Sequence, residues 1–145
     1  WPSRLKILCL FTGRRKKIIL YGRRISESWG TAEDIRTGVE LLHLDEVQHG
    51  IAAVNSKEVM QYLAERRIRL NITPTSNRKL GRVATYEEHP IKTLYREGIE
   101  VTINSDDVLM FDSDVSKEYQ RLYDHGTLLA EELDEIRVCG LRPVG

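Results

Sequence analysis

Apolar residues recur along most of this chain either at helical spacing or at every second position, and the two patterns follow one another in turn. Ile35, Val39 and Leu42 recur at helical spacing after Thr31, and Asp34 stands three residues beyond Thr31, as in a capping box. A helix is therefore predicted over residues 32–42. The same criteria predict further helices over 56–67, 90–98, 116–124 and 128–138, and strands over 45–49, 69–73 and 101–104.

This alternation of strand and helix, with short connections, predicts an α/β domain built from right-handed βαβ units on a parallel sheet. Both a doubly wound sheet and a (β/α)-barrel satisfy the pattern. Polar groups end three successive strands, namely His49, Thr75-Ser76-Asn77 and Asp106-Asp107. Barrel enzymes gather their chemistry at the carboxyl ends of several strands, so this feature favours the barrel. No glycine-rich phosphate-binding motif is present to support a nucleotide cofactor.

Composition narrows the classes of partner. The 145 residues suit one domain, and 22 basic residues balance 22 acidic ones, so no overall charge favours nucleic acid or an anionic membrane. Cys9 and Cys139 lie far apart in no metal-binding spacing, and no apolar run is long enough to span a bilayer. These observations predict a cytoplasmic protein with free thiols.

The first 28 residues differ from the rest. They are basic, with a possible strand over 17–21, and are interpreted as a solvated lead-in in preference to an anion-binding patch.

The adjacent acids Asp106 and Asp107 follow the alternating run Val101-Thr102-Ile103-Asn104. Ser-Asp-Asp is common turn chemistry at the end of a strand, which is the simplest interpretation. Successive strand residues point to opposite faces, so two functional aspartates here would have different roles.

Four short motifs, in order, resemble the adenosine deaminase family of zinc-dependent amidohydrolases. They are Gln48-His49-Gly50, Thr73-Pro74-Thr75-Ser76-Asn77, Glu88-His89-Pro90-Ile91 and Asn104-Ser105-Asp106-Asp107, with Glu118-Tyr119 after them. The resemblance covers about residues 30–142. It implies the C-terminal half of a (β/α)₈ barrel, with about four parallel strands alternating with helices over residues 29–145.

The resemblance also implies roles. Asp106 matches the zinc ligand of the last barrel strand, Asp107 the acid that binds the purine ring, and His49 the histidine that orients the attacking hydroxide. His43 and His125 have no counterpart and are expected at the surface, and His89 is expected to open a helix. Thr75-Ser76-Asn77 is expected to be a hydrogen-bonded loop that supports the site.

The chain departs from the family pattern before Trp29. The family's His-Ala-Gly-Glu segment, which supplies a zinc histidine and the proton-shuttling glutamate, is absent, and Ile25-Ser26-Glu27-Ser28 stands near its place. The paired histidines of the first barrel strand are absent as well. One hypothesis is that the first 28 residues derive from a frameshifted or rearranged coding sequence.

Three interpretations follow. The chain is an inactive part of a zinc-dependent adenosine or adenine deaminase, a degenerate half-barrel that binds or self-associates without catalysis, or an enzyme completed by a partner chain. A half-barrel leaves open sheet edges and an uncovered apolar core, so a homo-oligomer or a complementing N-terminal half is the expected partner.

Overall fold

A computed structural model describes residues 5–12, 15–22 and 30–143, and its centre is one sheet of five strands. The strands are β1 (Leu5–Thr12), β2 (Arg15–Gly22), β3 (Glu46–Gln48), β4 (Arg69–Ile72) and β5 (Val101–Ile103), and they lie side by side in that order. β1 is antiparallel to β2, and β2 to β5 are parallel. About four parallel strands were expected within residues 29–145, and the described residues there contain three, β3 to β5. The fourth parallel strand, β2, lies in the first 28 residues and includes the possible strand predicted over 17–21. The additional antiparallel strand, β1, was not predicted.

Helices connect the parallel strands and continue after the last one. They are α1 (Ala32–Leu42), the 3₁₀ helix η1 (Ile51–Asn55), α2 (Lys57–Glu65), α3 (Pro74–Lys79), α4 (Ile91–Arg96), α5 (Val108–Phe111), α6 (Val115–Asp124) and α7 (Ala130–Leu141). α1 begins with the predicted capping box: the Thr31 hydroxyl accepts from the Asp34 amide at 3.2 Å, and the Asp34 carboxylate accepts from the Thr31 amide at 2.7 Å. The short helices α3 and α5 were not predicted.

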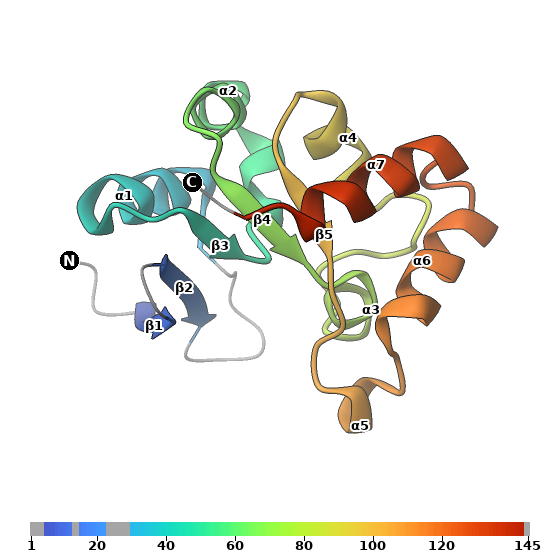
Figure 1. Ribbon diagram of the computed structural model, residues 1–145. Helices are drawn as coiled ribbons and strands as arrows, with labels where there is room; N and C mark the ends of the chain where they lie inside the picture. The colour runs from blue at the N-terminus through green and yellow to red at the C-terminus, as the bar shows by residue number, and fades with distance from the viewer. Residues whose placement is uncertain (1–4, 13–14, 23–29, 144–145) are drawn as a thin grey trace.

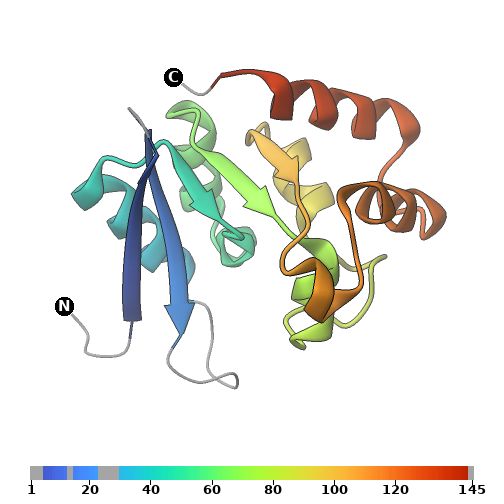
Figure 2. The same cartoon turned by 60° about the horizontal axis from the view of Figure 1, so that its bottom comes forward.

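The β1–β2 hairpin lies at one end of the sheet and α6 and α7 at the other (Figures 1 and 2). β5 is the last strand of the described sheet on the side of α6 and α7. Figure 1 also shows α3 and α5 beyond the carboxyl ends of β4 and β5, while α2 and α4 lie at the top of the picture and α1 at its left. Within the described ranges, no helix has the length and apolar character needed to cross a membrane.

One face of the sheet belongs to the hydrophobic core. Val47, Leu70 and Val101 stand next to one another across β3, β4 and β5, and each is at most 1% exposed. They pack in one cluster with Ile35 of α1 and Leu94 of α4. Burying side chains of this size supplies most of the free energy that holds helices on a sheet.

The other face of β3 to β5 is polar and buried. The Asn71 amide donates to Glu46 at 3.0 Å and accepts from the Thr102 hydroxyl at 2.7 Å, and Asn104 donates to Thr102 at 2.8 Å. Arg69 donates to the carbonyl oxygens of residues 139 and 142, at the end of α7. The expectation of an uncovered apolar core is wrong for these strands. Their apolar face is buried against helices, and their other face carries hydrogen-bonded polar side chains.

Candidate functional site

The predicted site residues meet beyond the carboxyl ends of β3, β4 and β5. His49 follows β3, and its backbone amide donates to the carbonyl oxygen of Asn71 at 2.8 Å, which ties it to β4. His49 and Gly50 both have positive φ, at 62° and 66°. A histidine in this left-handed conformation is uncommon, and such strain concentrates at functional sites. The backbone therefore turns sharply at His49.

The segment after β4 supplies the centre of the site. Thr75-Ser76-Asn77, predicted as a supporting loop, lies in the first turn of α3, which Pro74 opens at a position where its missing N–H costs no hydrogen bond. All three side chains are at most 1% exposed. A helix fixes successive side chains in different directions, and each of these three contacts a different neighbour.

Asn77 joins two histidines. Its Nδ2 lies 3.3 Å from Nδ1 of His49, and its Oδ1 lies 3.1 Å from Nε2 of His89. Nδ1 of His49 also lies 2.9 Å from the Thr73 hydroxyl, and Nδ1 of His89 accepts from the backbone amide of Ile91 at 3.1 Å. His89 does precede helix α4, as expected, but it is also a buried part of this network.

Asp106 and Asp107 have different surroundings although they are adjacent. The Asp106 carboxylate accepts from the Ser76 hydroxyl at 2.8 Å through one oxygen and from the backbone amide of Asp107 at 3.0 Å through the other. Asp107 is the N-cap of α5, and its Oδ1 accepts from the amides of Leu109 and Met110, both at 3.0 Å. Both aspartates are exposed. The turn chemistry expected of Ser-Asp-Asp is therefore present, with one carboxylate held toward α3.

A second polar cluster holds α3 from the other side. Glu118 of α6, 1% exposed, accepts from the backbone amide of Thr75 at 2.9 Å and from the Ser113 hydroxyl. Arg121 donates to the hydroxyls of Thr75 and Ser113 at 2.8 and 2.7 Å, and Thr75 also contacts the Tyr86 hydroxyl at 2.9 Å. This cluster was not predicted. In the sequence, only the position of Glu118 within a motif of the family pointed to this cluster.

Burial keeps both network histidines neutral near pH 7. Loss of solvation lowers the pKa of His49 to about 4 although the charge of Asp106 opposes this, and burial alone lowers the pKa of His89 to about 4. A neutral imidazole has one donor and one acceptor nitrogen, so its hydrogen bonds have a definite direction. His43 and His125 are exposed, as expected.

The donor set is incomplete for a catalytic metal. Among the residues that the structure describes, no group of three His, Cys, Asp or Glu side chains is arranged to hold a metal ion. Catalytic zinc usually takes three protein ligands. Asp106, Asp107 and His49 all carry suitable atoms, but in the described part of the chain they do not form such a group.

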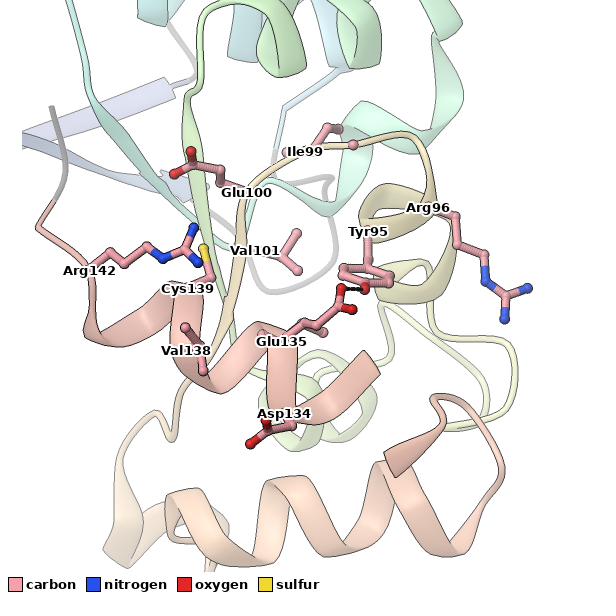
Figure 3. A pocket seen from close by; sticks show the side chains of 12 residues that line it. Tyr95, Arg96, Ile99, Glu100, Val101, Asp134, Glu135, Val138, Cys139 and Arg142 are labelled. Carbon is pink, nitrogen blue, oxygen red and sulfur yellow. Dashed lines mark hydrogen bonds between the residues drawn. The ribbon is translucent and has the colours of Figure 1, made fainter. Parts of the chain in front are cut away.

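A cleft of about 580 Å³ lies elsewhere, between α4, the start of β5 and α7 (Figure 3). Tyr95 and Glu135 face each other across it and form a hydrogen bond that raises the pKa of Tyr95 to about 12. Its lining includes Glu100 and Val101, at the start of β5, whereas Asp106 follows the other end of that strand. The cleft is therefore separate from the predicted site.

Comparison with known proteins identifies the family of the chain. The sequence model of a family described as adenosine deaminase matches residues 27–143. The chain belongs to the adenosine deaminase family. A putative adenosine/adenine deaminase of Treponema pallidum is 44% identical over 110 residues, which are 76% of this chain and 32% of that protein. An aminodeoxyfutalosine deaminase of Streptomyces coelicolor is 45% identical over 78 residues, 54% of this chain and 20% of the relative.

Solved structures of the superfamily share the fold. An adenine deaminase from Arthrobacter aurescens superposes with a TM-score of 0.72 at 26% identity, over 76% of this chain and 34% of that one. An amidohydrolase from Burkholderia ambifaria with bound Zn gives 0.68 at 26% identity, over 76% and 31%. The matched 76% of this chain thus corresponds to part of an amidohydrolase barrel. The chain spans about a third of the length of these relatives.

Proposed function

We propose that this chain is the C-terminal part of a zinc-dependent deaminase that hydrolytically deaminates adenosine or adenine. One observation carries the proposal: His49, Ser76, Asn77 and Asp106 meet at the carboxyl ends of three adjacent parallel strands. This is the end of a barrel at which catalytic residues gather. Family membership supplies the reaction type, and the relatives' names supply the purine substrate class.

Each site residue has a proposed role. Asp106 contributes one ligand to zinc, because its carboxylate has lone pairs beyond those that accept from Ser76 and the Asp107 amide. Asp107 uses the oxygen that does not cap α5 to bind the purine ring. His49 orients the attacking hydroxide. The described residues do not complete the zinc ligand set, so we propose that the chain alone is inactive.

A second candidate is a degenerate half-barrel that binds or self-associates without catalysis. It is favoured by the incomplete ligand set and by an exposed apolar edge on α5, where Leu109 is 96% and Met110 68% exposed. An apolar edge next to the last strand of the described sheet suits a second copy or an N-terminal half of the barrel. Light scattering at micromolar concentration tests this, and a monodisperse monomer argues against self-association.

A chimera tests the deaminase proposal apart from the activity of the isolated chain. The matching segment of the Treponema pallidum relative is replaced by that of this chain, and zinc content and the loss of adenosine absorbance are measured. We expect zinc and turnover in the chimera, loss of both with Asp106→Asn, and loss of turnover alone with Asp107→Ala.

The matched control is Asp134→Asn on the exposed face of α7, which leaves both properties unchanged. A folded chimera that binds zinc and lacks turnover contradicts the proposal. Stoichiometric zinc and turnover by the 145-residue chain itself would contradict the proposed inactivity.

A further inference from the structure

A chain of hydrogen bonds runs from a backbone amide on α4 to the ring of His49. It passes from the Ile91 amide to Nδ1 of His89, from Nε2 of His89 to Oδ1 of Asn77, and from Nδ2 of Asn77 to Nδ1 of His49. We propose that this relay fixes the proton of His49 on Nε2, with His89 and Asn77 acting as positioning residues. The consequence for catalysis rests on the proposed function, whereas the relay itself does not.

The direction of the relay follows from its first member. A backbone N–H can only donate, so Nδ1 of His89 must be the acceptor, and in a neutral ring the proton is then on Nε2. That proton faces the Asn77 side chain, which must present its carbonyl oxygen there. The amide nitrogen of Asn77 is thereby turned toward Nδ1 of His49 and requires a lone pair at that atom.

The opposite protonation of His49, on Nδ1, is incompatible with the backbone N–H of Ile91. If Nδ1 of His49 carried the proton, Asn77 would have to turn its oxygen toward it and its NH₂ group toward His89. Nε2 of His89 would then accept, and the proton on its Nδ1 would meet the Ile91 N–H. Two donors facing each other in a buried site leave both without a hydrogen bond, which is costly.

The remaining contacts of the relay agree with this direction. The Thr73 hydroxyl can rotate, so at 2.9 Å it donates to Nδ1 of His49 beside Asn77. Asn77 is fully buried and His89 is 2% exposed, so water does not compete for these bonds. Both rings are neutral near pH 7, as the relay requires.

The relay decides between two roles for His49. With the proton on Nε2 and the lone pair of Nδ1 occupied by Thr73 and Asn77, a ligand that reaches Nε2 of His49 meets a hydrogen-bond donor and not a general base. His49 can therefore orient an attacking oxygen in the proposed reaction, and it does not accept a proton from it through Nδ1.

Nuclear magnetic resonance of the ¹⁵N-labelled 145-residue chain tests the relay. Two-bond ¹H–¹⁵N spectra at pH 7 identify the protonated nitrogen of each of the four histidines. His43→Gln and His125→Gln assign the two exposed rings and leave the other two spectra unchanged. We expect His49 and His89 both protonated on Nε2.

Asn77→Asp then replaces the donor that faces His49 by an acceptor of the same shape. We expect Nδ1 of His49 to become protonated while His89 keeps its proton on Nε2. A role of Asn77 in packing alone would leave the protonated nitrogen of His49 unchanged, and that result overturns the proposal.

Two further measurements test the relay without this variant. A proton on Nδ1 of either buried histidine in the unsubstituted chain also overturns it. If Asn77→Asp does not fold, His89→Gln is measured instead. It frees the Asn77 amide to rotate, so the single Nε2 form of His49 is expected to become a mixture, and an unchanged single form counts against the relay. Neither measurement requires deaminase activity, so failure of the proposed function would leave them intact.

Discussion

Glu118→Ala tests whether α3 is held in place by the buried cluster on α6. The Glu118 carboxylate accepts from the Thr75 amide at 2.9 Å and from the Ser113 hydroxyl, and it lies 3.9 Å from the Arg121 guanidinium. The side chain is 1% exposed. Its removal leaves a buried amide and a hydroxyl without their acceptor and a partly buried cation without its counter-charge.

The expected loss of stability follows from these contacts. A hydrogen bond to a charged group contributes about 1.5–3 kcal/mol, and removing one partner of a buried ion pair costs about 3–5 kcal/mol. Arg121 keeps its bonds to the hydroxyls of Thr75 and Ser113, which limits the loss on its side. We therefore expect the free energy of unfolding to fall by about 3–5 kcal/mol, a large part of the roughly 5–15 kcal/mol of a typical domain.

Urea denaturation followed by circular dichroism measures this change. Glu118→Gln keeps the shape and one acceptor oxygen for the Thr75 amide, so we expect it to cost only about 1–2 kcal/mol. Glu131→Ala, on the exposed first turn of α7, is the matched control and should stay within about 0.5 kcal/mol. If Glu118→Ala unfolds at the same urea concentration as Glu131→Ala, Glu118 does not hold α3.

Three further changes are tested by the same denaturation assay. Leu63→Ala empties a fully buried position and should cost about 2–5 kcal/mol, whereas Leu41→Ala, 61% exposed, should change little. Gly50→Ala should lower the free energy of unfolding by about 1–3 kcal/mol, because φ is 66° and the added Cβ would lie 2.7 Å from the side chain of buried Leu70. An unchanged free energy of unfolding would contradict the left-handed turn. His89 has a pKa of about 4 in the folded chain against 6.5 ordinarily, so the unfolded chain takes up its proton first as the pH falls. The lowered pKa of His89 should therefore reduce the free energy of unfolding by roughly 2 kcal/mol between pH 7 and pH 5, a range above that in which carboxylates titrate. If the urea midpoint of His89→Gln changed with pH as much as that of the unsubstituted chain, this assignment would be wrong.

The order of strands and helices could be predicted because their periodic patterns are long enough to read. The helix over 32–42 has the predicted boundaries, since a capping box marks its start and three apolar residues define one buried face. α3 and α5 have six and four residues, too few for a helical period to appear in the sequence. Their only local signals are Pro74 at a first helical position and Asp107 as an N-cap.

The site could be predicted only in part, because its support comes from residues distant in sequence. His49, Asp106 and Asp107 were identified by short motifs at strand ends. The contacts of Asn77 with His89, 12 residues away, and of Thr75 with Glu118, 43 residues away, depend on how α4 and α6 pack and have no local pattern. Sequence motifs thus identify the candidate site side chains, while the packing of the helices determines which hydrogen bonds orient these side chains.

Asp106 and Asp107 show how the packing assigns different roles to identical side chains. β5 ends at Ile103, so strand alternation does not orient the two aspartates. Ser76 on α3 holds the carboxylate of Asp106, and the start of α5 occupies one oxygen of Asp107. Because Glu118 holds the α3 turn that carries Ser76, loosening this cluster should disturb Asp106 and leave the Asp107 cap intact. In the chimera, Glu118→Ala should therefore weaken zinc retention more than Asp107→Ala does. Equal zinc content in the two variants would show that Glu118 does not support the position of Asp106.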